Sequence, residues 1–291
     1  MTWRTIVISN RAKLDLKMNH LVVRQMEDYK KVYLGEVGVV VLETTAVSIT
    51  SALLNELAKR NIAVIVCDEK RNPSACLQRH GTHFEANRRL HQQMSWSDDV
   101  KQQVWTEIVK NKIYQQSKML ADYKLENASK VLKLMEEVQL GDVSNREGHA
   151  SKVYWHTLYG KGFSRGMDCP VNAALNYGYA IILSLISREI TASGYLTQLG
   201  IGHDNVHNPF NFSSDLIEPF RCIVDRYVYE SEIEVFDKTA RYELLNLLNK
   251  EVVISDKRNT VTNSIQIYCR SVFKALNEEN PSLLRFYEYG V

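Results

Sequence analysis

Three segments of the sequence concentrate the acids and histidines that could carry chemistry: SNREGHASKVYW (144–155), LGIGHDNVHNPFNF (199–212) and SSDLIEPFRCIVDRY (213–227). Carboxylates on one rigid helical face, joined by an imidazole from a preceding loop, can hold Mg²⁺ or Mn²⁺, and the imidazole favours Mn²⁺. Such an ion would polarise a phosphodiester and activate an attacking oxygen. The three segments therefore indicate a candidate acidic metal site.

The third segment predicts an amphipathic helix. Apolar residues at 4, 3, 4 spacing form one buried stripe, namely Leu216, Phe220, Ile223 and Tyr227. Three acids then share a different face, namely Asp215, Glu218 and Asp225. In this arrangement the carboxylates would be available to a ligand.

The same acids have a purely structural alternative. Ser144 and Glu147, like Asp215 and Glu218, have the spacing of a capping box, in which the acid satisfies a backbone N–H at a helix start. Caps are common and metal sites are rare, so spacing alone favours capping. Pro219 complicates the second cap because a proline removes an early hydrogen bond of the helix.

The remaining polar and aromatic residues also allow two interpretations. His203 and His207 lie in a polar loop, where a solvated histidine is the usual outcome. Basic residues after Glu147 could contact phosphate, although exposed ones usually only solvate a surface: Lys152, Lys161 and Arg165. Aromatic residues could stack on bases, yet at helical spacing they are more often core: Tyr154, Trp155, Tyr159, Tyr177 and Tyr179.

Composition narrows the class of protein. The 291 residues suffice for two domains, and 45% are apolar. No apolar run reaches the roughly 18 residues of a membrane helix, and the start MTWRTIVISNRAK does not resemble a signal peptide, so we expect a cytoplasmic protein. The five cysteines lack a CxxC pair and are expected to be reduced and buried. A net charge of +2 is too small to predict a nucleic-acid partner.

The first third of the chain predicts strands. Residues 4–9 and 32–43 have strand patterns, and 13–17 and 21–25 form a hairpin across Met18, Asn19 and His20. A helix is expected over 48–61, with Ser48 as its N-cap, followed by the buried strand IAVIVCD. Residues 1–75 are therefore predicted to form a small β-rich domain with one helix.

Residues 76–96 are polar and basic and are predicted to connect two domains. Beyond them, helical periodicity is expected over 97–120, 144–159, 172–193, 215–230 and 263–276. The sequence therefore predicts an α+β chain, in which the β-rich N-terminal domain precedes a larger all-α domain over 97–291.

Four motifs in order resemble a known family, the CRISPR-associated integrase that captures foreign DNA as new spacers for antiviral defence, the first of the Cas proteins. They are Glu147-Gly148 with Ala150 and Tyr154-Trp155; Asn172-Ala173 with Leu175, Tyr177, Gly178 and Tyr179; Gly200-Ile201-Gly202-His203; and Asp215-Leu216-Ile217-Glu218-Pro219-Phe220-Arg221. The glutamate at 218 and the NPFNF stretch most resemble the type II-A branch. With the β-rich N-terminal domain, the resemblance covers essentially the whole chain.

The resemblance implies that Glu147, His203 and Glu218 are catalytic ligands of Mg²⁺ or Mn²⁺. It places Asp215 close by as an auxiliary acid and leaves His207 as the competing imidazole. It further implies a homodimer formed through the N-terminal domains. Two such dimers would flank one dimer of the small second Cas protein, with double-stranded DNA spanning the complex.

The chemistry implied is strand transfer. The 3′-hydroxyl at each end of a captured fragment attacks a phosphodiester at a border of the CRISPR repeat, and the same site can hydrolyse DNA as an endonuclease. Lys152, Lys161, Arg165 and Arg221 are candidate DNA contacts, while Cys222 is expected in the core, although its thiol could lie against the site. The alternatives are a stand-alone metal-dependent nuclease and a non-catalytic DNA-binding scaffold.

Overall fold

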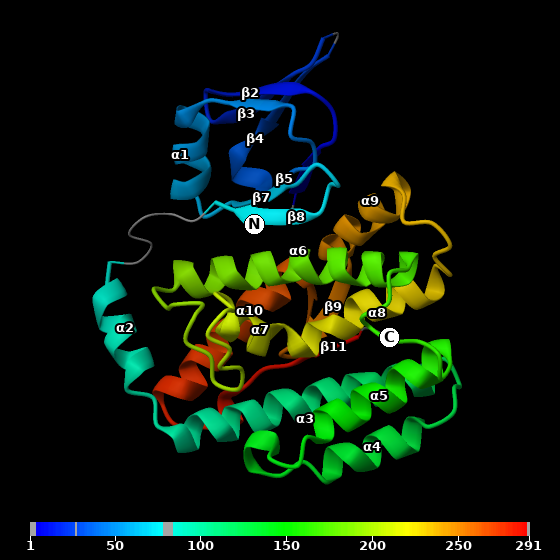
Figure 1. Ribbon diagram of the computed structural model, residues 1–291. Coiled ribbons are helices and arrows are strands. Elements are labelled where there is room, and N and C mark those ends of the chain that lie inside the picture. The colour runs from blue at the N-terminus through cyan, green and yellow to red at the C-terminus, as the bar shows by residue number, and fades with distance from the viewer. Residues whose placement is uncertain (1–3, 27, 78–83, 290–291) are drawn as a thin grey trace.

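A strand-rich N-terminal part lies against a larger, mostly helical part (Figure 1), in a computed structural model that describes residues 4–26, 28–77 and 84–289. The α+β class expected from the sequence is confirmed. One four-stranded sheet has the order β1 (Arg4–Ile8), β5 (Val37–Leu42), β7 (Ala63–Cys67) and β8 (Pro73–Cys76). The other has the order β4 (Tyr29–Tyr33), β3 (His20–Arg24), β2 (Ala12–Lys17) and β6 (Val47–Ile49).

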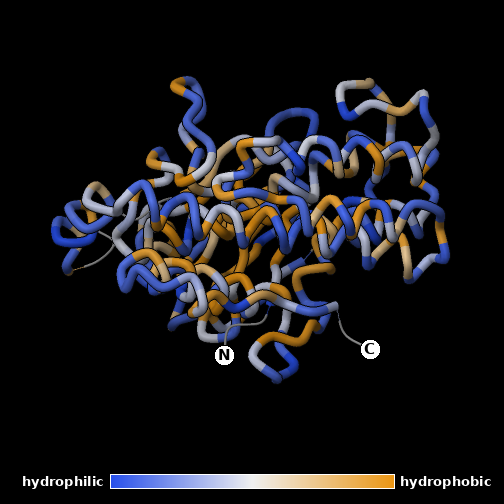
Figure 2. Tube along the Cα trace, turned by 90° about the horizontal axis from the view of Figure 1, so that it is seen from below, coloured by the Kyte–Doolittle hydropathy of each residue, from blue (hydrophilic) through white to orange (hydrophobic). Residues whose placement is uncertain are grey.

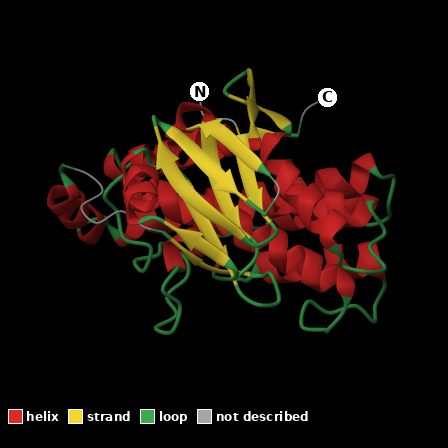
Figure 3. Cartoon of the chain, turned by 90° about the horizontal axis from the view of Figure 1, so that it is seen from above, coloured by secondary structure: helices red, strands yellow, loops and turns green. Residues whose placement is uncertain are grey.

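Strand β5 joins the two parts of the molecule because both of its faces are buried. Successive side chains of a strand point to opposite faces of the sheet. Val39 and Val41 pack into the core of the helical part, whereas Val40 and Leu42 pack into the core of the N-terminal part. Figure 3 shows the strands lying across the helices. A continuous apolar run is the expected sequence of such a doubly covered strand.

The predicted hairpin over 13–25 is confirmed as β2 and β3, but two local predictions were wrong. The run 32–43 is not one strand, because a 3₁₀ turn over Leu34–Glu36 carries the chain from one sheet to the other. Helix α1 (Ser51–Lys59) is capped by Thr50, whose hydroxyl accepts the N–H of Leu53, while Ser48 lies in β6. The chain pairs as a strand up to Ile49, so the helix begins two residues later than predicted.

Helices make up most of the second part: α2 (Ala86–Met94), α3 (Asp98–Asp122), α4 (Ala128–Glu136), α5 (Arg146–Tyr159), α6 (Pro170–Ala192), α7 (Asn211–Ile217), α8 (Arg221–Glu230), α9 (Lys238–Asn246) and α10 (Val261–Asn277). Helix α2 lies within the segment predicted as a connector. The helix expected over 215–230 is divided into α7, a 3₁₀ turn over Glu218–Phe220 and α8, and Pro219 lies in the turn. A proline has no N–H to continue the α-helical pattern.

The second part also contains a small antiparallel sheet that the all-α expectation lacked: β10 (Lys257–Thr260), β9 (Glu251–Ile254) and β11 (Tyr287–Glu288). Helix α6 crosses the centre of the molecule between the N-terminal strands and the remaining helices (Figure 1). Apolar residues concentrate along the inner segments and hydrophilic residues along the outer turns (Figure 2). In the part of the chain that the structure describes, no helix is both long and apolar enough to cross a membrane.

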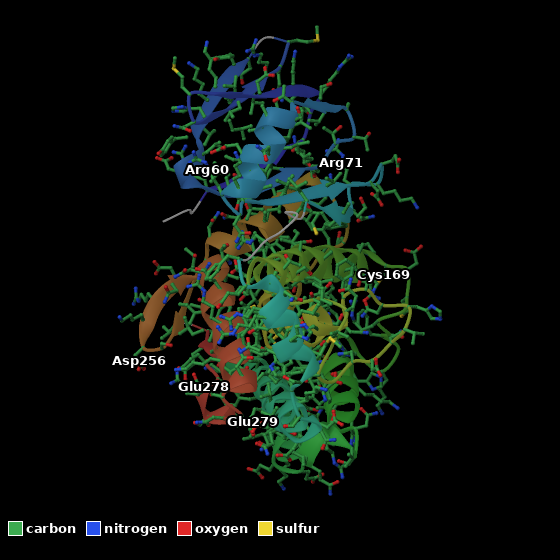
Figure 4. All side chains as sticks on the ribbon, turned by 90° about the vertical axis from the view of Figure 1, so that its left-hand side faces the viewer. Arg60, Arg71, Cys169, Asp256, Glu278 and Glu279 are labelled. Atoms are coloured by element: carbon green, nitrogen blue, oxygen red, sulfur yellow. The ribbon has the colours of Figure 1, made fainter. Side chains whose placement is uncertain are left out.

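A buried carboxylate ties the two parts together electrostatically. Glu43, which is 2% exposed, lies 3.3 Å from Arg71 of the strand-rich part and 2.8 Å from Arg241 of α9. Figure 4 labels Arg71 on the strand-rich part, near its border with the helices. A buried carboxylate without such partners would be costly, so this pairing favours one orientation of the two parts.

Close packing of α6 against α8 and α9 leads to a first prediction. A Cβ added at Gly178 would lie 2.5 Å from Cγ1 of Val224 and 3.2 Å from Cδ2 of Leu244. We expect Gly178→Ala to destabilise the protein by about 1–3 kcal/mol through overpacking, partly offset by the better helix propensity of alanine. Calorimetry should show a lower melting temperature.

Gly162→Ala is the matched control, since a Cβ there has no atom within 4 Å. In the background of Val224→Ala, Gly178→Ala should cost much less, because the clashing methyl groups are gone. Equal losses in both backgrounds would contradict the packing explanation.

Candidate active site

Two of the predicted site residues, Glu147 and Glu218, meet around a lysine. Nζ of Lys112, on α3, contacts Oε1 of Glu147 in the first turn of α5 and Oε2 of Glu218 in the 3₁₀ turn before α8. Lys112 and Glu218 are 7% and 3% exposed, whereas Glu147 is half-buried. Three elements that are distant in the sequence therefore place two carboxylates against one cation.

The start of α5 frees the side chain of Glu147 for this contact. Asn145 caps the helix by accepting the N–H of Gly148 at 3.1 Å. The carboxylate of Asp142 accepts the N–H groups of Arg146 and Glu147 at 2.8 and 3.0 Å. The capping box proposed for Ser144 and Glu147 was therefore wrong, because other side chains satisfy these donors.

Glu218 is held by two cationic side chains. Nε and Nη2 of Arg221 lie 3.0 and 2.9 Å from its Oε1 atom, and Lys112 contacts Oε2 without hydrogen-bond geometry. Burial by itself would raise the pKa of Glu218, but the charges of Arg221 and Lys112 lower it to about 2. Glu218 is thus ionised at neutral pH. Arg221, a predicted DNA contact, forms an ion pair with this acid.

Asp215 does not cap a helix but holds the loop over 201–203, which carries His203. Its fully buried carboxylate accepts the backbone N–H groups of Ile201, Gly202 and His203 at 2.6, 3.2 and 2.8 Å. Nδ1 of His203 lies 2.7 Å from the same carboxylate. The second proposed capping box was therefore also wrong. A carboxylate on Nδ1 leaves Nε2 as the nitrogen that can bind a metal.

The surroundings of the two candidate histidines differ. The hydrogen bond with Asp215 raises the pKa of His203, an effect that burial partly offsets and the charges of Glu218 and Glu147 reinforce. The ring also packs edge-on against Trp105, with 5.4 Å between centroids. His207 is exposed, and its backbone N–H donates to the side chain of Asn205. The structure thus brings His203, rather than His207, to an acid of the site.

Among residues 4–26, 28–77 and 84–289, no three His, Cys, Asp or Glu side chains are already grouped as metal ligands. Lys112 lies between the two glutamates, and Nδ1 of His203 faces Asp215. The donors nevertheless fit a divalent cation. Both carboxylates already share the positive charge of Lys112. Oε2 of Glu218 is buried and contacts that ammonium but has no hydrogen bond, so it can serve as an oxygen ligand.

Lys112 was not among the site residues predicted from the sequence. Its signal was a lysine within the apolar stripe that Ile108, Val109 and Ile113 form on the buried face of α3. A charged residue at such a position is rarely buried unless a partner of opposite charge compensates it. The pattern could have indicated a buried ion pair, but it could not have indicated which acids form it.

A cavity of about 230 Å³ extends from the two glutamates and is also lined by Arg165, Tyr179 and Asp225. The guanidinium of Arg165 lies 5.4 Å from the ring centre of Tyr179 and faces Trp155 at 5.5 Å. Cys222 lines the same cavity but is 1% exposed, and burial raises the pKa of its thiol well above the usual value. Of the four predicted DNA contacts, Arg165 and Arg221 line this cavity, whereas Lys152 and Lys161 are exposed and do not line it.

The third acid of the predicted face, Asp225, belongs to a separate buried network. It is 1% exposed and accepts hydrogen bonds from the hydroxyls of Tyr154, at 3.0 Å, and Tyr179. Burial raises its pKa to about 6, although both hydroxyl donors act in the opposite direction. Asp225 therefore contributes a buried carboxylate beside the cavity rather than a third oxygen donor next to Glu218.

Comparisons with known proteins agree with this architecture. Residues 5–233 match the family model described as CRISPR associated protein Cas1. A relative from Neisseria meningitidis serogroup C (strain 8013), described as CRISPR-associated endonuclease Cas1, is 35% identical over 226 residues, or 77% of this chain and 74% of the relative.

Two solved structures share the fold. A casposase bound to integration product matches with a TM-score of 0.77 at 16% identity, covering 96% of this chain and 92% of the casposase. A chain of a Cas6-RT-Cas1–Cas2 complex matches with a TM-score of 0.75 at 17% identity. The match covers 97% of this chain but only 36% of that longer chain.

The raised pKa of Asp225 leads to a second prediction. Its value in the folded protein, about 6, exceeds the usual 3.8, so folding favours the protonated carboxyl. This stability is present at low pH and is lost as the pH rises towards and through 6. Relative to Asp225→Asn, the wild type should lose about 2 kcal/mol of unfolding free energy between about pH 4.5 and pH 7.5. Urea unfolding measures this difference.

Tyr154→Phe provides a second variant with a defined direction. It removes one hydrogen bond to the carboxylate, so it should raise the pKa of Asp225 further and widen the pH dependence. A stability difference between wild type and Asp225→Asn that does not vary with pH would refute this reading of the network.

Proposed function

The chain belongs to the Cas1 family of CRISPR-associated proteins, and we propose that it is a metal-dependent integrase that joins captured DNA fragments into a CRISPR repeat. The observation that carries the proposal is the convergence of Glu147 and Glu218 on one cationic position. The loop that Asp215 fixes adds the imidazole of His203 nearby.

Glu147, Glu218 and Nε2 of His203 are the groups that would hold Mg²⁺ or Mn²⁺. Bound there, the ion would align an attacking 3′-hydroxyl and stabilise negative charge on the phosphate under attack. Asp215 keeps the imidazole oriented, and Arg221 keeps Glu218 ionised and in place. Arg165 places a positive charge in the adjoining cavity, where it can contact a phosphate oxygen.

The proposed reaction is a transesterification. A bond forms between the 3′-oxygen of the fragment and the phosphorus at the repeat border. The bond from that phosphorus to the 3′-oxygen of the repeat strand breaks. The attacking hydroxyl loses its proton to solvent, and the departing 3′-oxygen takes one up, so no external energy source is required. With water as the attacking group, the same site would act as an endonuclease.

Assembly is part of the proposal. We expect a homodimer formed through the N-terminal parts, with two dimers bridged by a dimer of the small second Cas protein and double-stranded DNA across them. The structural match to a chain of a complex that contains Cas1 and Cas2 supports that partner. The match to a casposase bound to integration product supports joining rather than hydrolysis as the main reaction.

The structure bears differently on the two alternative functions, a non-catalytic DNA-binding scaffold and a stand-alone nuclease. A non-catalytic scaffold required both glutamates to be helix caps, and the caps at the start of α5 are Asn145 and Asp142 instead. Glu218 is engaged by Lys112 and Arg221 rather than by a helix start. A stand-alone nuclease uses the same acids and therefore remains the second candidate.

A third prediction tests the proposed function. The protein, its small partner, a duplex with free 3′-hydroxyls and a plasmid bearing a CRISPR repeat are incubated with Mg²⁺ or Mn²⁺. We expect joined products that disappear with a chelator. Glu218→Gln should reduce joining by more than the 10- to 100-fold typical of residues that only orient a ligand, and Asp215→Asn should fall within that range.

Glu234→Gln, an exposed residue, is the matched control and should join normally. Joining that survives chelation, or that is unchanged in Glu218→Gln, would refute the metal-dependent mechanism. If only hydrolysed products form with partner and repeat present, the stand-alone nuclease is the better description.

A further inference from the structure

Lys112 is a buried lysine whose ammonium is compensated by the carboxylates of Glu147 and Glu218. It is 7% exposed on α3, and burial of an ammonium costs free energy unless partners compensate. Lys110, two residues earlier, shows the ordinary alternative, because it pairs with Glu107 of its own helix at 3.0 Å near the surface. Lys112 thus occupies the meeting point of the two proposed metal-binding carboxylates.

The charges around this point are nearly balanced. Glu147 and Glu218 pair with Lys112 and Arg221, and Asp215 contacts His203. These three acids and two cations together carry one net negative charge while His203 is neutral. If a divalent cation takes the two glutamates and the displaced ammonium of Lys112 stays beside them, the same groups carry one net positive charge. That charge matches a phosphodiester, which carries one negative charge.

Without Lys112 the same groups would carry two net negative charges. A divalent cation alone would then neutralise the site, and a phosphate would no longer be needed to balance the charge. Without Lys112, a divalent cation alone would neutralise the site. With Lys112, neutrality needs a divalent cation together with an anion such as a phosphodiester.

We propose that Lys112 is a resident counter-ion that competes with the divalent cation for Glu147 and Glu218 and thereby couples cation binding to DNA binding. This inference rests on the proposed function, because it takes those acids as metal ligands. Since binding linkage is reciprocal, DNA should strengthen cation binding as much as the cation strengthens DNA binding. The chain would thus bind the cation weakly until DNA is present.

The test compares Lys112→Met with Lys110→Met, a matched removal of a lysine from the same helix. Mn²⁺ is titrated by calorimetry into the metal-free full chain at one pH, with and without a short duplex. Without DNA, Lys112→Met should bind Mn²⁺ about tenfold more tightly than wild type, which corresponds to about 1.4 kcal/mol. The duplex should increase affinity less in this variant than in wild type, and Lys110→Met should behave as wild type.

Thermal unfolding gives a second readout that does not depend on activity. Metal-free Lys112→Met should melt at a lower temperature because the two carboxylates then repel each other. Saturating Mn²⁺ should raise its melting temperature by more than it raises that of wild type. Lys112→Gln, of similar length and without charge, should show the same two trends.

The outcomes separate the inference from the proposed function. Unchanged or weaker Mn²⁺ binding by both Lys112 variants would overturn the counter-ion role. Failure of both variants to fold even with Mn²⁺ would also overturn it, because the lysine would then be structural. If wild type binds no Mn²⁺, or if its Mn²⁺ binding is unchanged in Glu218→Gln, there is no metal site at these residues and the proposed function is also wrong.

Discussion

Two ionised carboxylates repel each other inside a protein unless a positive charge compensates them, and the site of this chain depends on that constraint. Glu147 and Glu218 come from separate helical segments, and their like charges would hold those segments apart. The ammonium of Lys112 links them, and Arg221 holds Glu218 from its other oxygen. The packing of α3 against α5 and the turn before α8 is therefore also an electrostatic arrangement.

The interruption of the helix at Glu218 separates the acids of this segment. A 3₁₀ turn at Glu218–Phe220 separates α7 from α8, with Pro219 inside it. On α7, Asp215 is directed to the loop over 201–203, while Glu218 in the turn is directed to α3. Three acids that an unbroken helix would show on one face thus reach three different environments, with Asp225 in the third.

Local sequence patterns predict some elements of this architecture and not others. The helix predicted over 97–120 and the β2–β3 hairpin follow from local rules, and the structure confirms them as α3 and as the pairing of β2 with β3. The sequence also singled out Glu147 and Glu218, but through ordered motifs rather than through spacing. Spacing favoured caps, because it cannot show that Asn145 and Asp142 already satisfy the donors at the start of α5.

The features that sequence reasoning missed depend on contacts between distant segments. Lys112 could be recognised as misplaced within an apolar stripe, yet its partners lie on other helices. The small sheet of β9, β10 and β11 pairs residues near 252 with the last described residues, and short strands carry little periodicity of their own. Tertiary pairing decides such elements, so a single sequence predicts them poorly.

The contacts of Asp215 favour a positioning role over metal binding for this acid. Its Oδ2 atom accepts two backbone N–H groups, and its Oδ1 atom accepts a third and contacts Nδ1 of His203. A carboxylate that gave an oxygen to a cation would have to release some of these buried donors, each at a cost of about 1–3 kcal/mol. Oε2 of Glu218 has no hydrogen bond but contacts the ammonium of Lys112, so a cation that took this oxygen would have to displace that lysine rather than buried backbone donors. The proposed division between an acid that would bind the cation and an acid that orients His203 therefore follows from the partners that each carboxylate already has.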